Sequence, residues 1–197
     1  MAEYHLRTPI SEIDVRRLSV WDVVYITGEI YTARDAAHKR MIEYLDKGLS
    51  LPVDLKNSVV YHCGPLIRRK GREWKVIAAG PTTSMRMEAF SDRLIGELGV
   101  KLIIGKGGMG KGTVRAARKY HAAYGVFTGG AAVLASKAIK RVKDVKWLDL
   151  GMPEAIWVLE VKEFGPIIIT IDSHGNNVYE KVKKEALARL KGILTNL

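Results

Sequence analysis

Hydrophobic periodicity predicts strands and a helix in the first quarter of the chain. Residues 3–10 (EYHLRTPI) and 23–33 (VVYITGEIYTA) alternate apolar and polar side chains, as half-buried strands do. From Thr32 to Gly48 the apolar residues recur at helical spacing. The Thr32 hydroxyl can cap the first turn of this helix, and Gly48 can end it. The chain therefore begins with strands that lead into a helix.

The rest of the sequence continues to mix strands with helices. Antiparallel pairs alternate with strand–helix–strand units, so the pattern indicates an α/β fold that is not simply doubly wound. About eight strands and five helices are expected, without repeats or linkers, so residues 1–197 are predicted to form a single domain. Strands are predicted within 58–81 (two, joined by a charged turn at Lys70-Gly71), 100–105, 124–130 and 145–177 (two or three, with turns at Gly165-Pro166 and 175–177), and helices at 83–99, 111–122, 131–140 and about 176–195.

Composition places the chain among ordinary globular proteins. Hydrophobic residues make up 47% and charged residues 27% of 197 residues. No run reaches the roughly 18 apolar residues of a membrane helix, and the first residues lack a signal-peptide pattern, so a cytoplasmic location is expected. Cys63 is the one cysteine, which fits a reducing compartment. One thiol cannot by itself hold an iron–sulfur cluster that needs several thiolates.

The formal net charge of +11 makes an anionic partner or ligand plausible on electrostatic grounds. Nucleic acid, an acidic protein surface and small anionic substrates are the three options. Basic residues are spread along the whole chain, and the densest run, 67–75, has the pattern of a hairpin tip. No RNA-binding signature accompanies them. Nucleic-acid binding therefore ranks below a solvated, lysine-rich surface.

A glycine loop at residues 103–113 (IIGKGGMGKGT) follows a predicted strand and precedes a predicted helix. Gly105, Gly107 and Gly110 match the spacing of a dinucleotide fingerprint in the right structural context. That fingerprint also needs an acidic residue about 20 positions later to hold the ribose. The sequence there is GVFTGGAA and has no acid, so the fingerprint is incomplete.

The same loop almost matches a phosphate-binding P-loop. Gly105, Gly110 and Lys111 fall at the required positions, but Gly112 stands where a Ser or Thr must hold magnesium. Three interpretations stay open: a nucleotide site, a tight turn, or an anion site for something smaller than a nucleotide. Helix N–H groups together with Lys106 would suit a carboxylate.

Two other strand-to-helix turns carry arginines. Thr82, Thr83 and Ser84 crowd one helix start, with Arg86 in its first turn. Arg34 stands at another helix start, where a cation is unfavourable with the helix dipole unless it meets an anion. Such turns gather at one edge of an α/β sheet, where ligands bind. Two arginines and a lysine at one edge indicate a site for a small dicarboxylate.

No catalytic motif accompanies this anion site. A nucleophile elbow, a metal-ligand motif and a triad are all missing from the sequence. Cys63 is expected to be buried and inert. The histidines are scattered without ligand spacing and are expected to be structural or superficial, although His38 falls one turn beyond Arg34; they are His5, His38, His62, His121 and His174.

Six stretches, in this order, resemble one known family. They are GEIYTARDAAHKR (28–40), YHCGP (61–65), AAGPTTSMRM (78–87), IGKGGMG (104–110), TGGAA (128–132) and LGMPEAIWVLEV (150–161). The resemblance is to the β subunit, or C-terminal half, of class I (iron–sulfur) fumarate hydratases and L-tartrate dehydratases. It implies a swivelling β/β/α domain, which has three layers with mixed sheets.

The resemblance also implies a partner and a cofactor. A separate α subunit would bind a [4Fe-4S] cluster through three cysteines, in an α2β2 heterotetramer whose active site lies between the subunits. This chain would bind no cluster, and it could form a homodimer when made alone. The implied reaction is the reversible hydration of fumarate to L-malate. L-tartrate, mesaconate or another 2-hydroxy diacid would suit the same arginines.

Residue by residue, the resemblance assigns substrate binding to the arginines and to the glycine loop. Arg34 and Arg86 would bind the substrate carboxylates, and Lys106 would add a further positive charge. Gly105 and Gly107 would shape the loop around the substrate. This interpretation accounts for the incomplete nucleotide motifs, because no ribose, triphosphate or magnesium would need to be held.

The resemblance places the catalytic base on a threonine. Thr82 matches the proposed base, and Thr83 lies beside it. A threonine hydroxyl is a poor base in water, so the positive field of Arg86 and Lys106 would have to lower its pKa.

Overall fold

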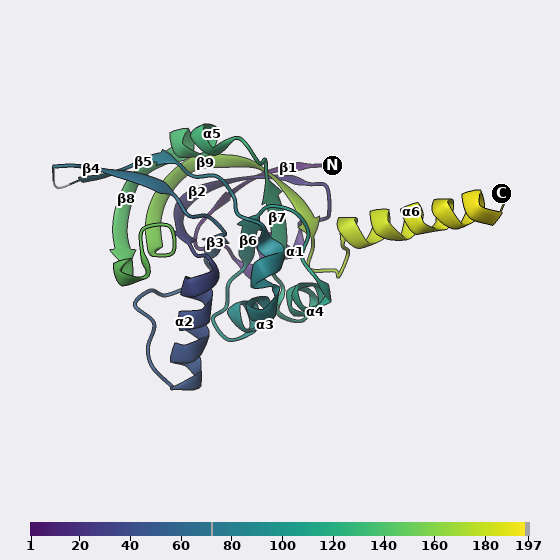
Figure 1. Cartoon of the computed structure of the whole chain (residues 1–197), viewed down its shortest axis with the longest axis horizontal. Helices are drawn as coiled ribbons and strands as arrows, with labels where there is room; N and C mark the ends of the chain where they lie inside the picture. Colours follow the sequence, from purple (N-terminus) through teal and green to yellow (C-terminus); the bar gives the residue numbers. More distant parts are fainter. Residues whose placement is uncertain (72, 196–197) are drawn as a thin grey trace.

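A seven-stranded mixed sheet forms the centre of the fold (Figure 1). The computed structural model describes residues 1–71 and 73–195. The strand order is β1-β2-β3-β6-β7-β9-β8, and β2 also pairs with β9, so the sheet closes on itself. The strands are β1 (Glu3–Arg7), β2 (Val23–Thr32), β3 (Val59–Tyr61), β6 (Leu102–Gly105), β7 (Ala123–Phe127), β8 (Ile139–Lys146) and β9 (Ile156–Ile171).

Helices lie on both sides of this sheet. Figure 1 shows α2, α3 and α4 along one side and α5 on the other, which gives the expected three-layer α/β arrangement. A separate hairpin, β4 (Leu66–Lys70) with β5 (Glu73–Ala78), extends from the body. The helical segments are α1 (Glu12–Arg16), α2 (Asp35–Asp46), η1 (Ser84–Met87), α3 (Glu88–Gly96), α4 (Lys111–Tyr120), α5 (Ala132–Ala138), η2 (Leu148–Leu150) and α6 (Val178–Thr195).

The strands that point the same way define one edge of the sheet. β1, β2, β3, β6 and β7 are mutually parallel, whereas β9 is antiparallel to its neighbours. Thr32 pairs with Tyr61, and Tyr61 in turn pairs with Ile104, so β2, β3 and β6 end side by side. The connections that follow these strands therefore emerge together.

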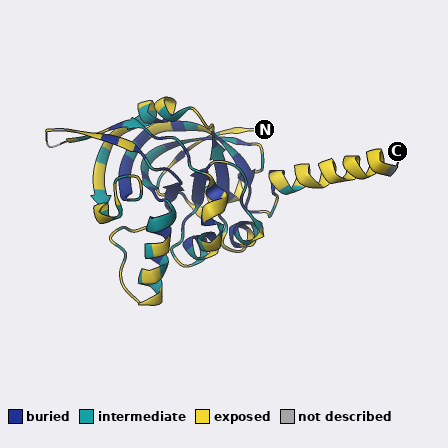
Figure 2. Ribbon diagram, in the orientation of Figure 1, coloured by how far each residue is buried: buried dark blue, intermediate teal, exposed yellow. Residues whose placement is uncertain are grey.

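Two apolar clusters hold the layers together, one on each face of the sheet (Figure 2). Successive side chains of a strand point to opposite faces, and β6 shows the consequence. Leu102 and Ile104 join the cluster inside the closed sheet, whereas Ile103 joins the cluster under the helices. Trp157 and Phe164 are fully buried within the first cluster. The face under α2, α3 and α4 therefore holds these helices against the strands that lead to the shared edge.

The predicted end of one helix was wrong, and the hydrophobic pattern did not predict the strand β8 that follows it. The helix expected at 131–140 ends at Ala138, and the chain continues directly as a strand. Ile139, Val142 and Val145 recur every third residue, which is not a strand period, yet all three pack on the core. Two register shifts against β9 explain this, because each bulge turns the next apolar residue inward. β8 lies at the end of the strand order, and charged side chains are typical of such an edge.

Strand β9 and the segment before α3 also differ from the prediction. A turn was predicted at Gly165-Pro166, but β9 runs straight through these residues. The register of β9 against β2 shifts at this point. The resulting bulge accommodates the proline, which cannot donate a hydrogen bond. Residues 58–81 contain three strands, because β3 forms before the hairpin. The hairpin turn was predicted at Lys70-Gly71, and the neighbouring Arg72 lies outside the described residues.

Thr32 does not cap α2, contrary to the prediction. It is the last residue of β2 and is fully buried, and its hydroxyl donates to the carbonyl of Ala155 at 3.4 Å and accepts from the N–H of Trp157 at 3.0 Å. α2 begins at Asp35, with Arg34 in the cap position and without a side-chain cap of its own.

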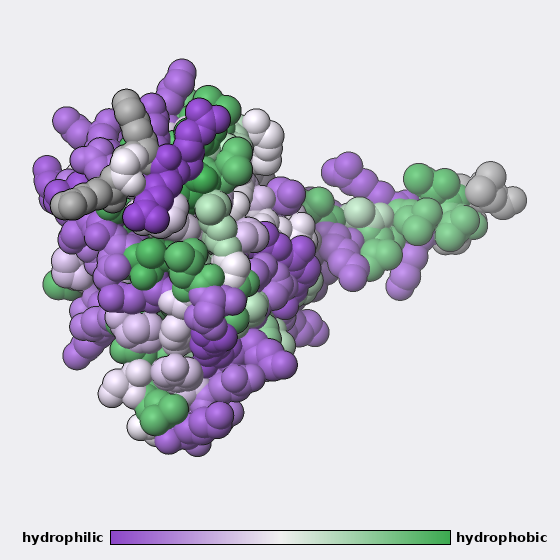
Figure 3. Space-filling model, turned by 60° about the vertical axis from the view of Figure 1, so that its left-hand side comes forward, coloured by the Kyte–Doolittle hydropathy of each residue, from purple (hydrophilic) through white to green (hydrophobic). Residues whose placement is uncertain are grey.

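Helix α6 projects away from the body (Figure 1) and confirms the predicted C-terminal helix. Its side chains from residue 181 to residue 194 are exposed. Figure 3 shows apolar side chains along it. Its exposed apolar residues include Leu187, Leu190 and Ile193. Within the described part of the chain, no helix is long and apolar enough to cross a membrane.

Removal of the projecting part of α6 is expected to leave the domain stable. Truncation after Val182 should shift the unfolding midpoint by no more than about 2 °C, because surface changes are usually within about 0.5 kcal/mol. Calorimetry of both chains would measure this. A control truncation that also removes Asn177, whose amide donates to the Met109 carbonyl at 3.2 Å, should lower the midpoint clearly. Equal midpoints for the two truncations would contradict this account.

Candidate functional site

The connections at the shared edge are joined by backbone hydrogen bonds. The N–H of His62 donates to the carbonyl of Ile104 at 2.8 Å, which continues the ladder beyond β3. The N–H of Thr82 donates to the carbonyl of His62 at 2.7 Å, and that of Ser84 to the carbonyl of Lys106 at 3.0 Å. The run of three hydroxyl residues therefore lies between the end of β3 and the glycine loop.

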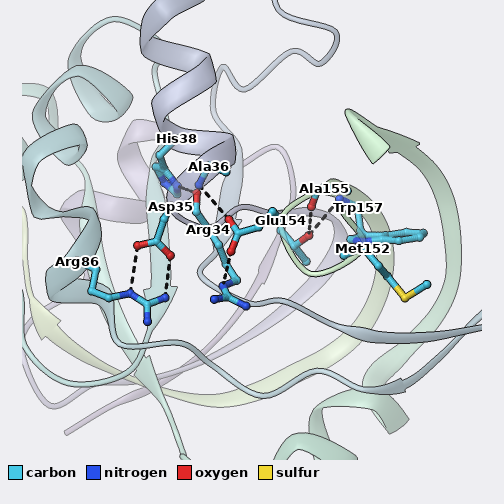
Figure 4. Close-up of polar contacts among 10 residues, drawn as sticks. Arg34, Asp35, Ala36, His38, Arg86, Met152, Glu154, Ala155 and Trp157 are labelled. Carbon is cyan, nitrogen blue, oxygen red and sulfur yellow. Dashed lines mark hydrogen bonds and ion pairs between the residues drawn. The ribbon is translucent and has the colours of Figure 1, made fainter. Parts of the chain in front are cut away.

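Arg34 follows β2 and is held by an acid from a distant segment (Figure 4). Its Nε lies 3.2 Å from Oε1 of Glu154, and the other carboxylate oxygen accepts from the N–H of Ala36 at 2.9 Å. Glu154 thus provides the anion for the first turn of α2 and fixes the arginine beside it. Arg34 also needs room at Gly64, where a Cβ atom would lie 2.7 Å from Nη1 of Arg34 and 2.7 Å from the carbonyl oxygen of Pro153.

Arg86 is held in the same way by the acid next to Arg34. Its Nε and Nη2 donate to the two carboxylate oxygens of Asp35 at 3.1 and 2.7 Å. Both side chains of this pair are nearly half exposed. In Figure 4 the guanidinium groups of Arg34 and Arg86 point to the same side of the first turn of α2. The two arginines predicted from separate turns are therefore neighbours.

Lys106 joins this group through the backbone of the hydroxyl run. Thr83 forms a parallel bridge with Lys106, and Arg86 follows three residues later. The Lys106 side chain is exposed and has no ion pair among the described residues. A Cβ at Gly129 would lie 3.3 Å from Cδ of this lysine, so the turn after β7 borders it. Thr82 is half-buried, whereas its neighbour Thr83 is exposed.

The charges at this edge do not cancel. Arg34, Arg86 and Lys106 carry three positive charges, and Asp35 and Glu154 carry two negative ones. The remaining positive charge and the unused guanidinium N–H groups suit an anionic ligand, and a dicarboxylate can use both arginines at once.

The start of α4, which follows the glycine loop, already holds a carboxylate. The N–H groups of Gly110 and Thr113 donate to the carboxylate of Glu88 at 2.7 and 3.1 Å, and the Thr113 hydroxyl donates at 2.5 Å. These groups lie where a P-loop would bind phosphate. The anion that they hold is part of the chain, which argues against a nucleotide at this helix start.

The glycines of the loop have different roles. Gly105 is buried and ends β6, and a Cβ there would lie 1.8 Å from Oγ of Ser84. Gly107 has a φ of 75°, a conformation that favours glycine, and its carbonyl accepts from the Tyr124 hydroxyl at 2.7 Å. Gly105 thus permits close packing, whereas Gly107 turns the loop beside Lys106.

Replacement of Glu88 by alanine is expected to destabilise the domain by about 2 kcal/mol, because buried donors lose their charged acceptor. Urea denaturation of the wild type and the variant would measure this. Glu185→Ala on the exposed part of α6 is the control and should change stability by less than about 0.5 kcal/mol. If Glu88→Ala is as stable as the control, the helix start does not depend on this carboxylate.

Cys63 does not fit as a cluster ligand. It is fully buried, and burial raises the pKa of its thiol far above the ordinary value, partly offset by Arg34. No group of three or more His, Cys, Asp or Glu residues that could hold a metal is present within the described ranges. An iron–sulfur cluster needs several thiolates, and this chain offers one buried thiol.

Several polar residues of the site were not predicted from the sequence. Asp35 and Glu154 hold the arginines, and Glu88 occupies the start of α4. An acid in the first turn of a helix, as at positions 35 and 88, is a local signal that could have been used. Glu154 offers no such signal, since only the fold brings it to Arg34.

Comparisons with known proteins cover almost the whole chain. The family model described as fumarase C-terminus matches residues 1–182. The L(+)-tartrate dehydratase subunit beta of Escherichia coli strain K12 is 45% identical over 179 residues, which are 91% of this chain and 88% of that protein. A putative L(+)-tartrate dehydratase subunit beta of Methanocaldococcus jannaschii is 43% identical over 186 residues, 94% of this chain and 95% of that protein. A putative fumarate hydratase class I of Geobacillus stearothermophilus is 41% identical over 94% of this chain, but the match spans only 35% of that longer protein.

Proposed function

Because this chain belongs to the fumarase C-terminus family, we propose that it is the β subunit of a hydro-lyase that reversibly hydrates fumarate to L-malate. The observation that carries the proposal is the grouping of Arg34, Arg86 and Lys106 at one edge of the sheet, where Glu154 and Asp35 pair with the two arginines and Lys106 has no ion pair among the described residues. Dehydration of L-tartrate is the second candidate, because the relatives that are separate β subunits carry that name.

The two arginines would bind the substrate carboxylates with the N–H groups that the chain leaves unused. Arg86 donates from Nε and Nη2 to Asp35, and its Nη1 has no hydrogen-bond partner in the described part of the chain, so it would be available to a ligand. Arg34 Nε lies 3.2 Å from Oε1 of Glu154 in an ion pair without hydrogen-bond geometry, and neither Nη atom has a hydrogen bond within the described residues. Each carboxylate would therefore approach the end of a guanidinium group whose direction is already fixed.

The glycine loop would complete the binding of the substrate. Lys106 would add a third cation, and Gly107 would give the loop its turn. Thr82 would act as the base, with Thr83 beside it. The backbone of Thr82 is fixed by its hydrogen bond to His62, and the neighbouring cations would favour loss of its hydroxyl proton.

The cluster that the resemblance implies would have to belong to another chain, since the residues here do not fit it. We propose an α subunit that carries the [4Fe-4S] cluster, in an α2β2 assembly that completes the active site, in the cytoplasm. Without that partner the chain would be inactive and could form a homodimer.

The test is an anaerobic assay of fumarate hydration by this chain alone and mixed with a cluster-loaded α subunit. Activity in the mixture only would support the proposal. A complex that forms but leaves fumarate unchanged would reject fumarate, and L-tartrate and mesaconate would be assayed next in the same mixture. The rival nucleotide interpretation requires that ATP or NAD raise the melting temperature of the isolated chain. Salt-dependent binding to DNA would instead support a nucleic-acid module.

A further inference from the structure

Three buried polar residues lie directly behind the candidate site and take no part in the proposed chemistry. His38, His62 and Ser84 are exposed by 1%, 0% and 0%. Burial of a polar group costs folding free energy unless the group is hydrogen-bonded, so a cluster of three buried polar residues needs a structural explanation. We propose that these three are positioning residues, which link the segment of Arg34 to that of Lys106 through an uncharged relay. The proposal rests on the function proposed above.

The relay begins at Arg34. The Nδ1 of His38 lies 2.7 Å from the carbonyl oxygen of Arg34, which also accepts the His38 N–H at 2.9 Å. A carbonyl can only accept, so Nδ1 carries the proton and Nε2 is a bare acceptor. Burial lowers the pKa of His38 to about 4, which keeps the ring neutral at physiological pH. The imidazole thus adds a second hydrogen bond to the residue that presents the arginine.

His62 is the middle link. Its ring meets that of His38 edge to face, with 5.0 Å between centroids and 76° between planes. This geometry is favourable between neutral rings. Burial, and secondly the proximity of His38, holds the pKa of His62 well below its ordinary value. The Nε2 atoms of both rings are buried without a hydrogen-bond partner among the described residues, so the contact between the rings is what joins the two histidines.

Ser84 connects the histidines to the glycine loop. Its Oγ lies 2.9 Å from Nδ1 of His62 and accepts the N–H of Lys106 at 3.2 Å. Its own N–H donates to the Lys106 carbonyl at 3.0 Å. Both backbone polar groups of Lys106 are therefore bound by one serine. The absence of a side chain at Gly105 leaves the space that the Ser84 hydroxyl occupies.

This arrangement can fix the spacing of the cations without adding charge. An ionised group in the same place would alter the field on the substrate and on Thr82, whereas neutral imidazoles leave it to the arginines and the lysine. If the relay sets the position of Lys106, then a substitution of His62 must change the backbone order at both Lys106 and His38. A residue that only fills the core would not transmit the effect in this way.

The experiment compares two replacements of His62 in the full chain. Asparagine places an amide group near the position of Nδ1 and can still bind Ser84, whereas leucine cannot. Amide hydrogen exchange by NMR would be read at Lys106 and His38 in the isolated chain. Thr170→Val is the control, since Thr170 is also buried, with a hydroxyl that has no partner among the described residues, but belongs to β9. Ser84→Ala is the second variant should His62→Leu not fold.

In His62→Leu we expect exchange at Lys106 and His38 to be about tenfold faster, with His62→Asn within about threefold of the wild type. Ser84→Ala should accelerate amide exchange at Lys106 by the same factor as His62→Leu. In the reconstituted enzyme, KM for the dicarboxylate should rise about tenfold with a smaller change in kcat. Unchanged exchange in both His62→Leu and Ser84→Ala, or an asparagine variant that behaves like leucine, would overturn the relay. If the wild-type mixture turns over no dicarboxylate, the proposed function fails, while the exchange data still decide on the relay.

Discussion

Replacement of Thr82 by alanine is expected to lower kcat of the reconstituted enzyme by roughly 10²- to 10⁴-fold, the range typical of a lost general base. The backbone of Thr82 donates to the His62 carbonyl at 2.7 Å, and alanine keeps this bond. The variant should therefore fold normally and bind the partner and the substrate. Steady-state kinetics would then show a fall in kcat with little change in KM.

Two companion variants locate the base. Thr82→Ser retains a hydroxyl and should recover most of the activity. Thr83→Ala removes the exposed neighbour and should have a smaller effect, because Thr83 follows the residue that matches the base. If Thr82→Ala keeps full kcat while Thr83→Ala loses it, the base is Thr83. Full activity in both would place the base on another residue.

The positions of the site residues could be predicted because they depend on local sequence. Arginines, hydroxyls and glycines at strand-to-helix turns gather wherever parallel strands end side by side, and β2, β3 and β6 do so. Such a prediction needs only the order of the elements. At the start of the helix that follows the glycine loop, the N–H groups hold the Glu88 carboxylate of the chain itself, and the predicted binding of a ligand carboxylate by this loop stays a prediction.

The partners of the site residues could not be predicted because they depend on the tertiary fold. Asp35 is 51 positions from Arg86, and Glu154 is 118 positions from Ala36, whose N–H it accepts. Nothing in the local pattern links them. The exposed edge strand β8 was missed for a related reason, since its bulges, and hence its apolar period, follow from pairing with β9. Local chemistry thus indicates the candidate ligand-binding edge, whereas long-range pairing determines the direction in which each cationic side chain points.

The orientation of Arg86, which Asp35 fixes, leads to the second prediction with a large effect on activity. Arg86→Ala should lower kcat/KM of the reconstituted enzyme by roughly 10²- to 10³-fold, as expected when a charged hydrogen-bond donor to the substrate is lost. The variant should remain folded, because the side chains of Arg86 and Asp35 are 47% and 43% exposed and such surface pairs contribute at most about 1 kcal/mol. Calorimetry of the isolated chain would measure the stability of the variant, and kinetics of the mixture would measure its kcat/KM.

A matched control separates substrate binding from the loss of an ion pair. Arg93 pairs with Asp46 at the far end of α2 and with Glu97, so Arg93→Ala removes comparable contacts away from the site. It should leave kcat/KM within about twofold of the wild type. Arg86→Lys keeps the charge but loses the fork that binds Asp35, and should recover only part of the activity. Normal turnover in Arg86→Ala would refute the assignment of this edge as the substrate site, whereas equal losses in Arg86→Ala and Arg93→Ala would mean that ion pairing, and not substrate contact, underlies the effect.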